Sequence, residues 1–546
     1  MNMTERTGVI ALIAAFSLLL FIELPGSALI EPDEARYAEI PREMLAAGDL
    51  VTPRLNGTKY YEKPPLLYWA NAASFKLLGE TPFAARLPAR LSALGTAALI
   101  AWSLGGEWGL WAALILLSAP LSFVLGRYNV TDGVLTFAMT LTLVAMRSFF
   151  QRRDRGESAI WALAALGLGA GLAVLAKGLI GIVLPGLVFL LWVGIVGEWK
   201  RLWELILSPA PVVLFAVAAP WFIMMERANP GFSQVFFIRE HFQRFATNEA
   251  KREGPIYYFV LAFIGGFLPW TFAFGAWLAS ARVKTREALK ERRDELLFAL
   301  WFFVILAFFS VSKSKLLPYI LPALPAAATL TAHRILGAPI RLRVALTVYA
   351  LLFTTALIVG IVFVWPFLGL MISGEALVAP ISGLAALIIG AWTAVRISAD
   401  GRRSALLAAT AGWGGLYLAL VVALPAFSHD LATDDLARYA ASVPGATVVA
   451  YKNYPQGFAW TLGHPIVVAD FTGELATDGN RPSELFWSNE EFWKRWKSGE
   501  PLAVVLRRRA LADWSTAGEP TPTALAFNGT YLVVTNVRPV PTAGRP

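Results

Sequence analysis

Apolar runs long enough to cross a bilayer recur along the chain from residue 8 to residue 425. A transmembrane helix needs roughly 20 mostly apolar residues, and this length divides the pattern into about thirteen predicted spans. We place them at 8–28, 84–104, 108–125, 133–150, 158–176, 179–197, 206–225, 256–279, 296–311, 316–333, 344–367, 376–396 and 404–425. The pattern predicts a polytopic α-helical membrane protein.

After residue 426 the pattern changes to short β-branched runs bounded by Gly, Pro, Asn and Asp, which is typical of strands. The runs are ATVVAYKNY, HPIVVADF, LAVVLRRR and TYLVVTNV, and the stretch FWSNEEFWKRWKSG between them favours a helix. We therefore expect a membrane domain over 1–426 and a soluble α/β domain over 427–546.

Composition and charge support this division. The chain is 57% hydrophobic and 16% charged, and it has no Cys, which excludes disulfides and thiolate chemistry. The net charge is +9. Basic loops at 147–155, 281–295, 333–343 and 396–403 share one side of the predicted topology, and the positive-inside rule assigns that side to the cytoplasm. This explains the charge without nucleic acid, and it places the N-terminus inside and the loop 29–83 and the C-terminal domain outside.

The outer loop begins with EPDEARYAEIPREML directly after the first span. Residues 33–45 can form an amphipathic interfacial helix on the bilayer surface, which Pro41 would interrupt or kink. The side chains expected to face lipid are Ala35, Ala38, Ile40, Met44 and Leu45. Asp33 and Glu34 fall in the first turn, where the helix dipole favours acids. They could therefore be stabilising acids at a helix end or chemically active groups.

Further charges gather on the predicted outer side. The stretch KYYEKPPL sets Lys59, Tyr60, Tyr61, Glu62 and Lys63 before a stiff Pro pair. Other outer loops add Arg127, Asp132, Lys177, Arg239, Glu240, His241, Arg244, Lys313, Lys315 and Tyr319. Asp132 could instead cap a helix, and Lys177 could extend to the interface. The positive-inside rule disfavours cations on the outer side of the membrane. Their presence there indicates a binding site for a phosphate carried on a lipid, since Arg and Lys are the usual donors to phosphate.

These motifs, taken together, resemble the ArnT/protein-O-mannosyltransferase family, which are membrane glycosyltransferases of the GT-C class. The resemblance covers most of the membrane region and rests on EPDEARYAEIPREM, KYYEKPPLLYW, GRYNVTDG, AKGLIG and SKSKLLPYILP. PDEARYAEIPREM with YYEKPPLLYW looks most like the ArnT branch. That resemblance implies a bacterial inner-membrane enzyme that moves 4-amino-4-deoxy-L-arabinose from undecaprenyl phosphate to lipid A phosphate groups in the periplasmic leaflet, giving resistance to polymyxin and cationic antimicrobial peptides.

The resemblance also implies roles for individual residues. Asp33 matches the family's first-loop acid, and Glu34 and Asp132 are the other candidate catalytic acids. Candidates for the donor lipid phosphate are Arg36, Tyr60, Lys63, Lys313, Lys315 and Tyr319. Candidates for the sugar or the acceptor are Glu62, Arg127, Lys177 and Arg239. Transfer is expected to need no cofactor, although a divalent ion, Zn or Mg, could bind Glu62 and His241. We expect a monomer.

Three alternatives stay open. A related transferase could use another sugar or a protein Ser/Thr acceptor, and Asp33 would then be an indispensable base. A lipid-linked sugar flippase would need ionisable residues near the middle of the spans, and the nearly uncharged spans favour an enzyme. The C-terminal domain could also be an independent glycan-binding module.

Overall fold

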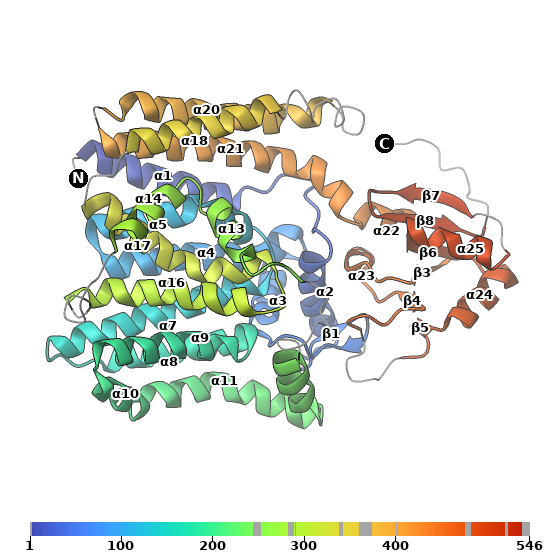
Figure 1. The fold of residues 1–546 in the computed structure, drawn as a ribbon. Helices are drawn as coiled ribbons and strands as arrows, with labels where there is room; N and C mark the ends of the chain where they lie inside the picture. Colours follow the sequence, from blue (N-terminus) through green and yellow to red (C-terminus); the bar gives the residue numbers. More distant parts are fainter. Residues whose placement is uncertain are drawn as a thin grey trace. The chain divides into compact units, whose positions relative to one another are not determined.

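The computed structural model describes residues 3–243, 253–281, 289, 291–337, 342–359, 374–399, 401–475, 482–518 and 522–537. The chain divides into two compact units (Figure 1). The first unit contains residues 1–23, 86–224 and 236–423, and the second contains 24–85, 225–235 and 424–546. The first outer loop and the C-terminal region therefore belong to one unit.

The first unit is built from apolar helices, several of which lie side by side along their length in Figure 1. Some of these helices extend into the second unit at one end. The helices are α1 (Met3–Phe21), α4 (Pro82–Leu104), α5 (Gly106–Ser118), α6 (Pro120–Gly126), α7 (Thr131–Asp154), α8 (Ile160–Lys177), α9 (Ile180–Val196), α10 (Trp199–Ile206), α11 (Pro209–Ala228), the π-helix η1 (Gln234–Gln243), α13 (Tyr258–Gly266), α14 (Thr271–Ser280), α16 (Arg293–Val311), the 3-10 helix η2 (Leu317–Ala323), α17 (Leu324–Gly337), α18 (Leu342–Val359), α20 (Gly374–Ile397) and α21 (Arg402–Leu431).

Within the described residues, each predicted span coincides with a helix or a pair of consecutive helices; residues 360–367 of the span 344–367 lie outside them. In the described part of the chain, nine helices are long and apolar enough to cross a membrane, or up to eleven if each of two bent pairs forms one span. The two remaining predicted spans are the shorter apolar helix α9 and the η2–α17 pair, which begins as a 3-10 helix. The polytopic helical architecture is confirmed.

Proline lies at the break in both bent pairs. Helices α5 and α6 meet at 70°, and α13 and α14 meet at 118°. Ala119 precedes Pro120 and has an extended backbone, a conformation that the proline ring favours in the residue before it because it crowds the helical one. Pro269 lies in the segment between α13 and α14. The local sequence therefore accounts for these two bends.

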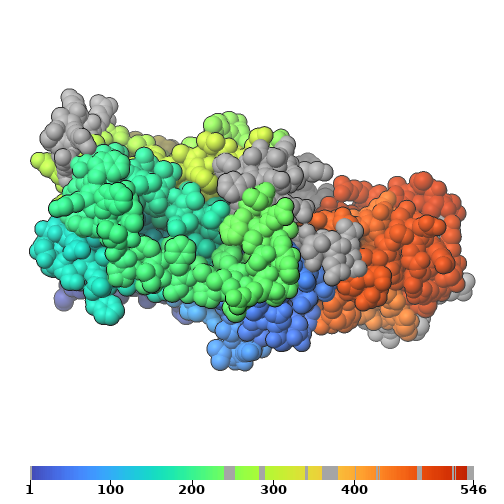
Figure 2. Space-filling model, turned by 90° about the horizontal axis from the view of Figure 1, so that it is seen from below, coloured from blue at the N-terminus to red at the C-terminus, as the bar shows by residue number. Residues whose placement is uncertain are grey.

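The first unit exposes apolar side chains where a soluble protein would expose polar ones. On α11, the exposed side chains include Val212, Phe215, Ile223 and Met224. This helix, coloured green, lies on the face of the molecule shown in Figure 2. An apolar surface of this extent is expected where a helix contacts lipid.

The second unit contains a six-stranded sheet with the strand order β5-β4-β3-β6-β8-β7. Its strands are β3 (Thr447–Tyr451), β4 (Val467–Ala469), β5 (Phe486–Trp487), β6 (Leu502–Arg507), β7 (Thr523–Phe527) and β8 (Tyr531–Thr535). Neighbouring strands from β5 to β6 are parallel, and β8 pairs antiparallel with β6 and β7. The four predicted strand runs are confirmed.

The other elements of the second unit are α2 (Asp33–Ala46), β1 (Arg54–Leu55), β2 (Thr58–Lys59), α3 (Leu66–Leu78), α22 (Asp434–Ala441), α23 (Gln456–Leu462), α24 (Asn489–Ser498), η4 (Arg508–Leu511) and α25 (Ala512–Thr516). The predicted helix in FWSNEEFWKRWKSG is α24, and the Ser488 hydroxyl caps it by accepting a hydrogen bond from the Glu491 amide at 3.1 Å. The core of the sheet domain includes Phe492, Trp496 and Trp514.

The first outer loop contains a short hairpin, β1–β2, which follows α2. Asn56 and Gly57 form its turn with φ of 52° and 73°. Asn and Gly tolerate this left-handed backbone better than other residues, so the dipeptide NG predicts such a turn. The turn brings two backbone amides next to the end of α2.

Candidate functional site

Helix α2 carries the acidic motif of the first outer loop and is almost completely enclosed by protein. It packs against α3 and α23. Ala35 and Ala38 are fully buried in an apolar cluster with Phe75, and Ile40 and Met44 are also fully buried. The prediction that these side chains face lipid is wrong, because other parts of the second unit cover them.

Helix α2 continues through Pro41 without interruption. Proline has no backbone amide, so the Tyr37 carbonyl lacks its usual partner four residues later. The Asn71 side-chain amide, fully buried on α3, donates a hydrogen bond to this carbonyl at 2.9 Å. A side chain from a neighbouring helix therefore compensates for the proline.

Several charged groups of the motif have structural roles. The Glu31 carboxylate accepts hydrogen bonds from the Gly457 amide at 2.5 Å, the Gln456 amide at 3.0 Å and the Thr433 hydroxyl at 2.8 Å. Burial raises the pKa of Glu31, and these three donors lower it in part. Glu31 therefore holds the start of the motif against the C-terminal region.

The C-terminal half of α2 carries a second group of structural charges. Arg42 donates two hydrogen bonds of 2.6 Å to Glu39 and one of 2.7 Å to the Gly463 carbonyl. Glu43 accepts from the amides of Asn56 at 2.6 Å and Gly57 at 2.9 Å. Burial, together with the neighbouring charge of Glu39, raises the pKa of Glu43 to about 8. None of these charged residues of α2 was a candidate from the sequence.

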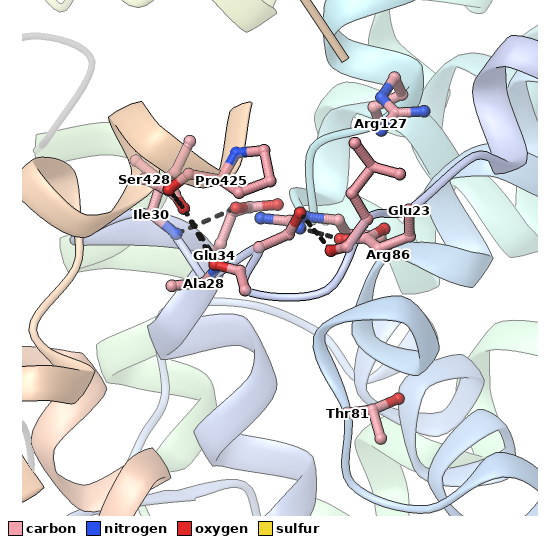
Figure 3. A network of polar contacts seen from close by, with 12 residues as sticks. Glu23, Ala28, Ile30, Glu34, Thr81, Arg86, Arg127, Pro425 and Ser428 are labelled. Atoms are coloured by element: carbon pink, nitrogen blue, oxygen red, sulfur yellow. Dashed lines mark hydrogen bonds and ion pairs between the residues drawn. The ribbon is translucent and has the colours of Figure 1, made fainter. Parts of the chain in front are cut away.

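The two acids in the first turn of α2 differ in environment. The Glu34 side chain is fully buried and accepts a hydrogen bond from the Ile30 amide at 3.0 Å (Figure 3). Asp33 keeps 31% of its side chain exposed and lies 3.4 Å from the Arg36 guanidinium. Asp33 is therefore the acid that a substrate could reach, whereas Glu34 stabilises the turn that precedes the helix.

Arg36, Tyr60 and Tyr68 form a cluster of buried donors. Arg36 pairs with Asp33 through Nη1 and with Glu474 through Nη2, at 3.4 and 2.7 Å. Its Nε and the hydroxyls of Tyr60 and Tyr68 are buried and have no hydrogen-bond partner within the described residues. Burial raises the pKa of both tyrosines well above the ordinary value, so both remain protonated donors. Three buried, protonated donors without an acceptor can together bind an anion.

Two more sequence candidates lie beside this cluster. Glu62 is nearly buried, and its charge influences the pKa of both Tyr60 and Tyr68. Lys63 donates a hydrogen bond from its ammonium group to the Glu62 carbonyl at 3.1 Å. Tyr68 was missed from the sequence, although it stands in the quoted stretch KPPLLYW.

In the first unit, Asp132, Lys177 and Tyr319 come together. The Lys177 ammonium lies 2.6 Å from an Asp132 carboxylate oxygen and 4.2 Å from the centre of the Tyr319 ring. Asp132 and Lys177 are both almost buried. Asp132 therefore pairs with a cation from the end of α8 and does not cap α7, and Lys177 does not extend to the surface.

Two other cations predicted for the site satisfy the carbonyl ends of helices. Arg127 donates to the carbonyls of Leu19, Leu20 and Ile22 at and beyond the end of α1. Lys315 donates to the carbonyls of Phe309 and Ser310 at 3.0 and 2.6 Å, near the end of α16. Helix C-terminal carbonyls favour such cations. These contacts are sufficient to explain both residues structurally.

The remaining sequence candidates are Lys313, Arg239 and His241, and no contact among the described residues assigns them to either cluster. Lys313 is exposed. Arg239 and His241 lie in η1, and their side chains are outside the described part of the structure. The described residues contain no group of three His, Asp or Glu side chains that could hold a metal ion.

Glu23 forms ion pairs with Arg86 and Arg90, which the sequence did not predict. The Arg86 contact is visible in Figure 3.

Comparisons with known proteins agree with this architecture. Residues 7–236 match the family model for dolichyl-phosphate-mannose-protein mannosyltransferase. Over 342 residues the chain is 36% identical to an undecaprenyl phosphate-alpha-4-amino-4-deoxy-L-arabinose arabinosyl transferase of Proteus mirabilis, which covers 61% of this chain and 60% of that relative. A second such transferase, from Yersinia enterocolitica, is 35% identical over 59% of this chain and 58% of its own length. The alignments thus span about three fifths of these relatives.

A solved structure is similar over nearly the whole chain. The crystal structure of ArnT from Cupriavidus metallidurans bound to undecaprenyl phosphate matches with a TM-score of 0.82 and 28% identity, covering 97% of this chain and 98% of that one. The predicted fold class is confirmed by this likeness. The Archaeoglobus fulgidus oligosaccharyltransferase, at 13% identity and a TM-score of 0.50 over 94% of this chain and 70% of that one, shares the fold alone.

Proposed function

We propose that the chain is a GT-C glycosyltransferase of the family that includes ArnT and the protein O-mannosyltransferases, and that it is an inner-membrane transferase of 4-amino-4-deoxy-L-arabinose. Its donor would be undecaprenyl phosphate-linked aminoarabinose and its acceptor a phosphate of lipid A. The observation that carries the proposal is the cluster of Arg36 Nε and the hydroxyls of Tyr60 and Tyr68, three buried donors that no acceptor among the described residues satisfies. A phosphate carried on a lipid is an anion that such donors bind well.

In this reaction an oxygen of the acceptor phosphate attacks the anomeric carbon of the sugar. The bond from that carbon to the donor phosphate breaks, and its electron pair leaves with undecaprenyl phosphate. Arg36, Tyr60, Tyr68 and Lys63 would stabilise the charge that develops on this leaving group. Preorganised donors of this kind act mainly in the transition state, because they need no reorientation as the charge grows.

Asp33 has a different role in the proposal. A phosphate acceptor is already anionic at neutral pH, so it needs little deprotonation. The partly exposed carboxylate of Asp33 would orient the acceptor or bind the cationic amino group of the sugar, and base catalysis would be secondary.

We further propose that the outer loop and the C-terminal region face the periplasm. The positive-inside rule supports this orientation, since the basic loops lie on the opposite side of the predicted topology. Transfer would need no resident metal. Activity of the purified protein is therefore expected to survive treatment with EDTA.

The experiment is mass spectrometry of lipid A from a transferase-null Gram-negative strain that carries this protein. Wild type is expected to add an aminoarabinose mass and to restore survival in polymyxin, whereas Lys63→Ala is expected to lose both. Asp33→Asn should retain part of the activity. The matched control is Glu490→Gln, an exposed side chain on α24.

Two outcomes would contradict the proposal. Unchanged lipid A in a strain that expresses the protein and contains the donor lipid would point to another sugar or to a protein acceptor. Complete loss of transfer in Asp33→Asn would indicate an indispensable base, which a Ser/Thr hydroxyl acceptor requires.

A further inference from the structure

The main ionic partner of Arg36 comes from the C-terminal region of the chain. Glu474 follows β4 and lies 2.7 Å from Arg36 Nη2, whereas Asp33, from the same turn of α2, is 3.4 Å from Nη1. The Arg36 side chain is 7% exposed. A buried guanidinium is stable only when carboxylates or other acceptors compensate its charge, so Glu474 is the stronger of its two anchors.

Glu474 is itself held in place. The Gln456 side-chain amide, which is almost completely buried, donates a hydrogen bond to the Glu474 carboxylate. The backbone amide of Gln456 donates to Glu31, which begins the acidic motif. These contacts form a continuous chain of polar groups from Glu31 through Gln456 and Glu474 to Arg36.

The neighbouring glycine shows how closely these segments approach. A side chain at Gly457 would place its Cβ 2.6 Å from the Thr433 hydroxyl and 2.8 Å from the Glu31 carboxylate. Both distances are too short for a Cβ atom, so any other residue would displace the Thr433 and Glu31 side chains from these positions. The close packing at Gly457 and the hydrogen bond from the Gln456 amide to Glu31 hold Gln456 next to Glu474.

The two contacts determine which part of Arg36 remains available. Asp33 and Glu474 bind the two terminal nitrogens, and Nε is left buried with no acceptor in the described part of the chain. Arg36 and Tyr60 are close enough for their charges to influence each other's pKa. Because a guanidinium is planar, anchoring both terminal nitrogens also sets the direction of Nε.

We propose that Glu474 and Gln456 are positioning residues that orient Arg36 for the phosphate of the donor lipid. The C-terminal region is then a part of the transfer machinery and not a separate binding module. This inference rests on the proposed function, in which Arg36 binds that phosphate.

The test measures binding of undecaprenyl phosphate to the purified full-length protein, together with KM and kcat for transfer. Glu474→Gln is expected to weaken binding and to lower kcat/KM by about tenfold, since it removes the charge from a charge-assisted contact. Glu474→Asp should restore part of the loss. Glu490→Gln, an exposed glutamate of the same domain, should leave both quantities unchanged.

A double-mutant cycle separates positioning from general stabilisation. In an Arg36→Lys background, Glu474→Gln is expected to add little further loss, because its effect acts through the guanidinium. If Glu474→Gln lowers the melting temperature strongly, Gln456→Ala is the second variant. It keeps Glu474 but removes its donor, and a loss of several-fold in donor affinity is expected.

The outcomes are distinguishable. Wild-type protein that does not bind undecaprenyl phosphate would overturn the proposed function and this inference with it. Wild-type protein that binds, with equal binding by Glu474→Gln and Gln456→Ala, would overturn the inference alone. Additive losses in the cycle would also overturn it, since they would show that Glu474 does not act through Arg36.

Discussion

Raising the pH from about 5.5 to about 7.5 is expected to destabilise the second unit through Glu43. Burial, together with the charge of Glu39, raises the pKa of Glu43 from 4.5 to about 8. The folded protein therefore keeps a proton on Glu43 that the unfolded chain releases. Stability falls as pH rises from the unfolded pKa to the folded one, and the full penalty is reached above about pH 8.

The magnitude follows from proton linkage. One proton bound only in the folded state lowers the free energy of unfolding by about 1.4 kcal/mol per pH unit, or roughly 3 kcal/mol over this interval. For a unit of this size, that corresponds to a fall in melting temperature of roughly 5–10 °C.

Glu43→Gln is the informative variant because its amide does not titrate. It also offers one acceptor to the two backbone amides of Asn56 and Gly57, which Glu43 satisfies together. The amide left without an acceptor should cost about 1–3 kcal/mol at every pH. The variant is therefore expected to be less stable than wild type near pH 5.5, with a melting temperature that changes much less as the pH rises.

The assay is thermal unfolding of the full-length protein in detergent, followed by tryptophan fluorescence. Trp496 and Trp514 lie in the core of the sheet domain and contribute to this signal when the second unit unfolds. Glu490→Gln, which is exposed, should follow the wild-type curve. Parallel pH profiles for wild type and Glu43→Gln would refute the assignment of the proton to Glu43.

Two further predictions concern buried polar pairs, and both can be measured by the same unfolding assay. Lys177→Met is expected to cost about 3–5 kcal/mol, because it leaves the Asp132 carboxylate buried without its cation. Adding Asp132→Asn should recover part of that loss, and an equal or larger loss in the double variant would contradict the pairing. Asn71→Leu should cost about 1–3 kcal/mol by removing the donor to the Tyr37 carbonyl. Adding Pro41→Ala should recover stability, since alanine at this position supplies a backbone amide to that carbonyl; no recovery would show that the Asn71 contact matters for another reason.

The positions of the membrane helices were largely predictable, because hydrophobic length and period are local signals. In the part of the chain that the structure describes, each of the thirteen predicted spans coincides with helical structure, even where a proline bends it or the helix is short. The strands of the C-terminal domain were also predictable from β-branched runs between turn residues. Arg36 and Tyr60 were also predicted as site residues from a local signal, because charged side chains and phenols stand together in short stretches of the sequence.

The partner of each charge was not predictable in this way. Glu31, Arg42 and Arg36 all contact residues more than 400 positions away in the chain. A local pattern cannot distinguish a carboxylate that meets a substrate from one that meets the amide end of a distant helix, since both have the same sequence signature. The lipid-facing prediction for α2 failed for a related reason: an apolar helix face indicates an apolar environment, and only the tertiary structure decides whether lipid or protein provides it.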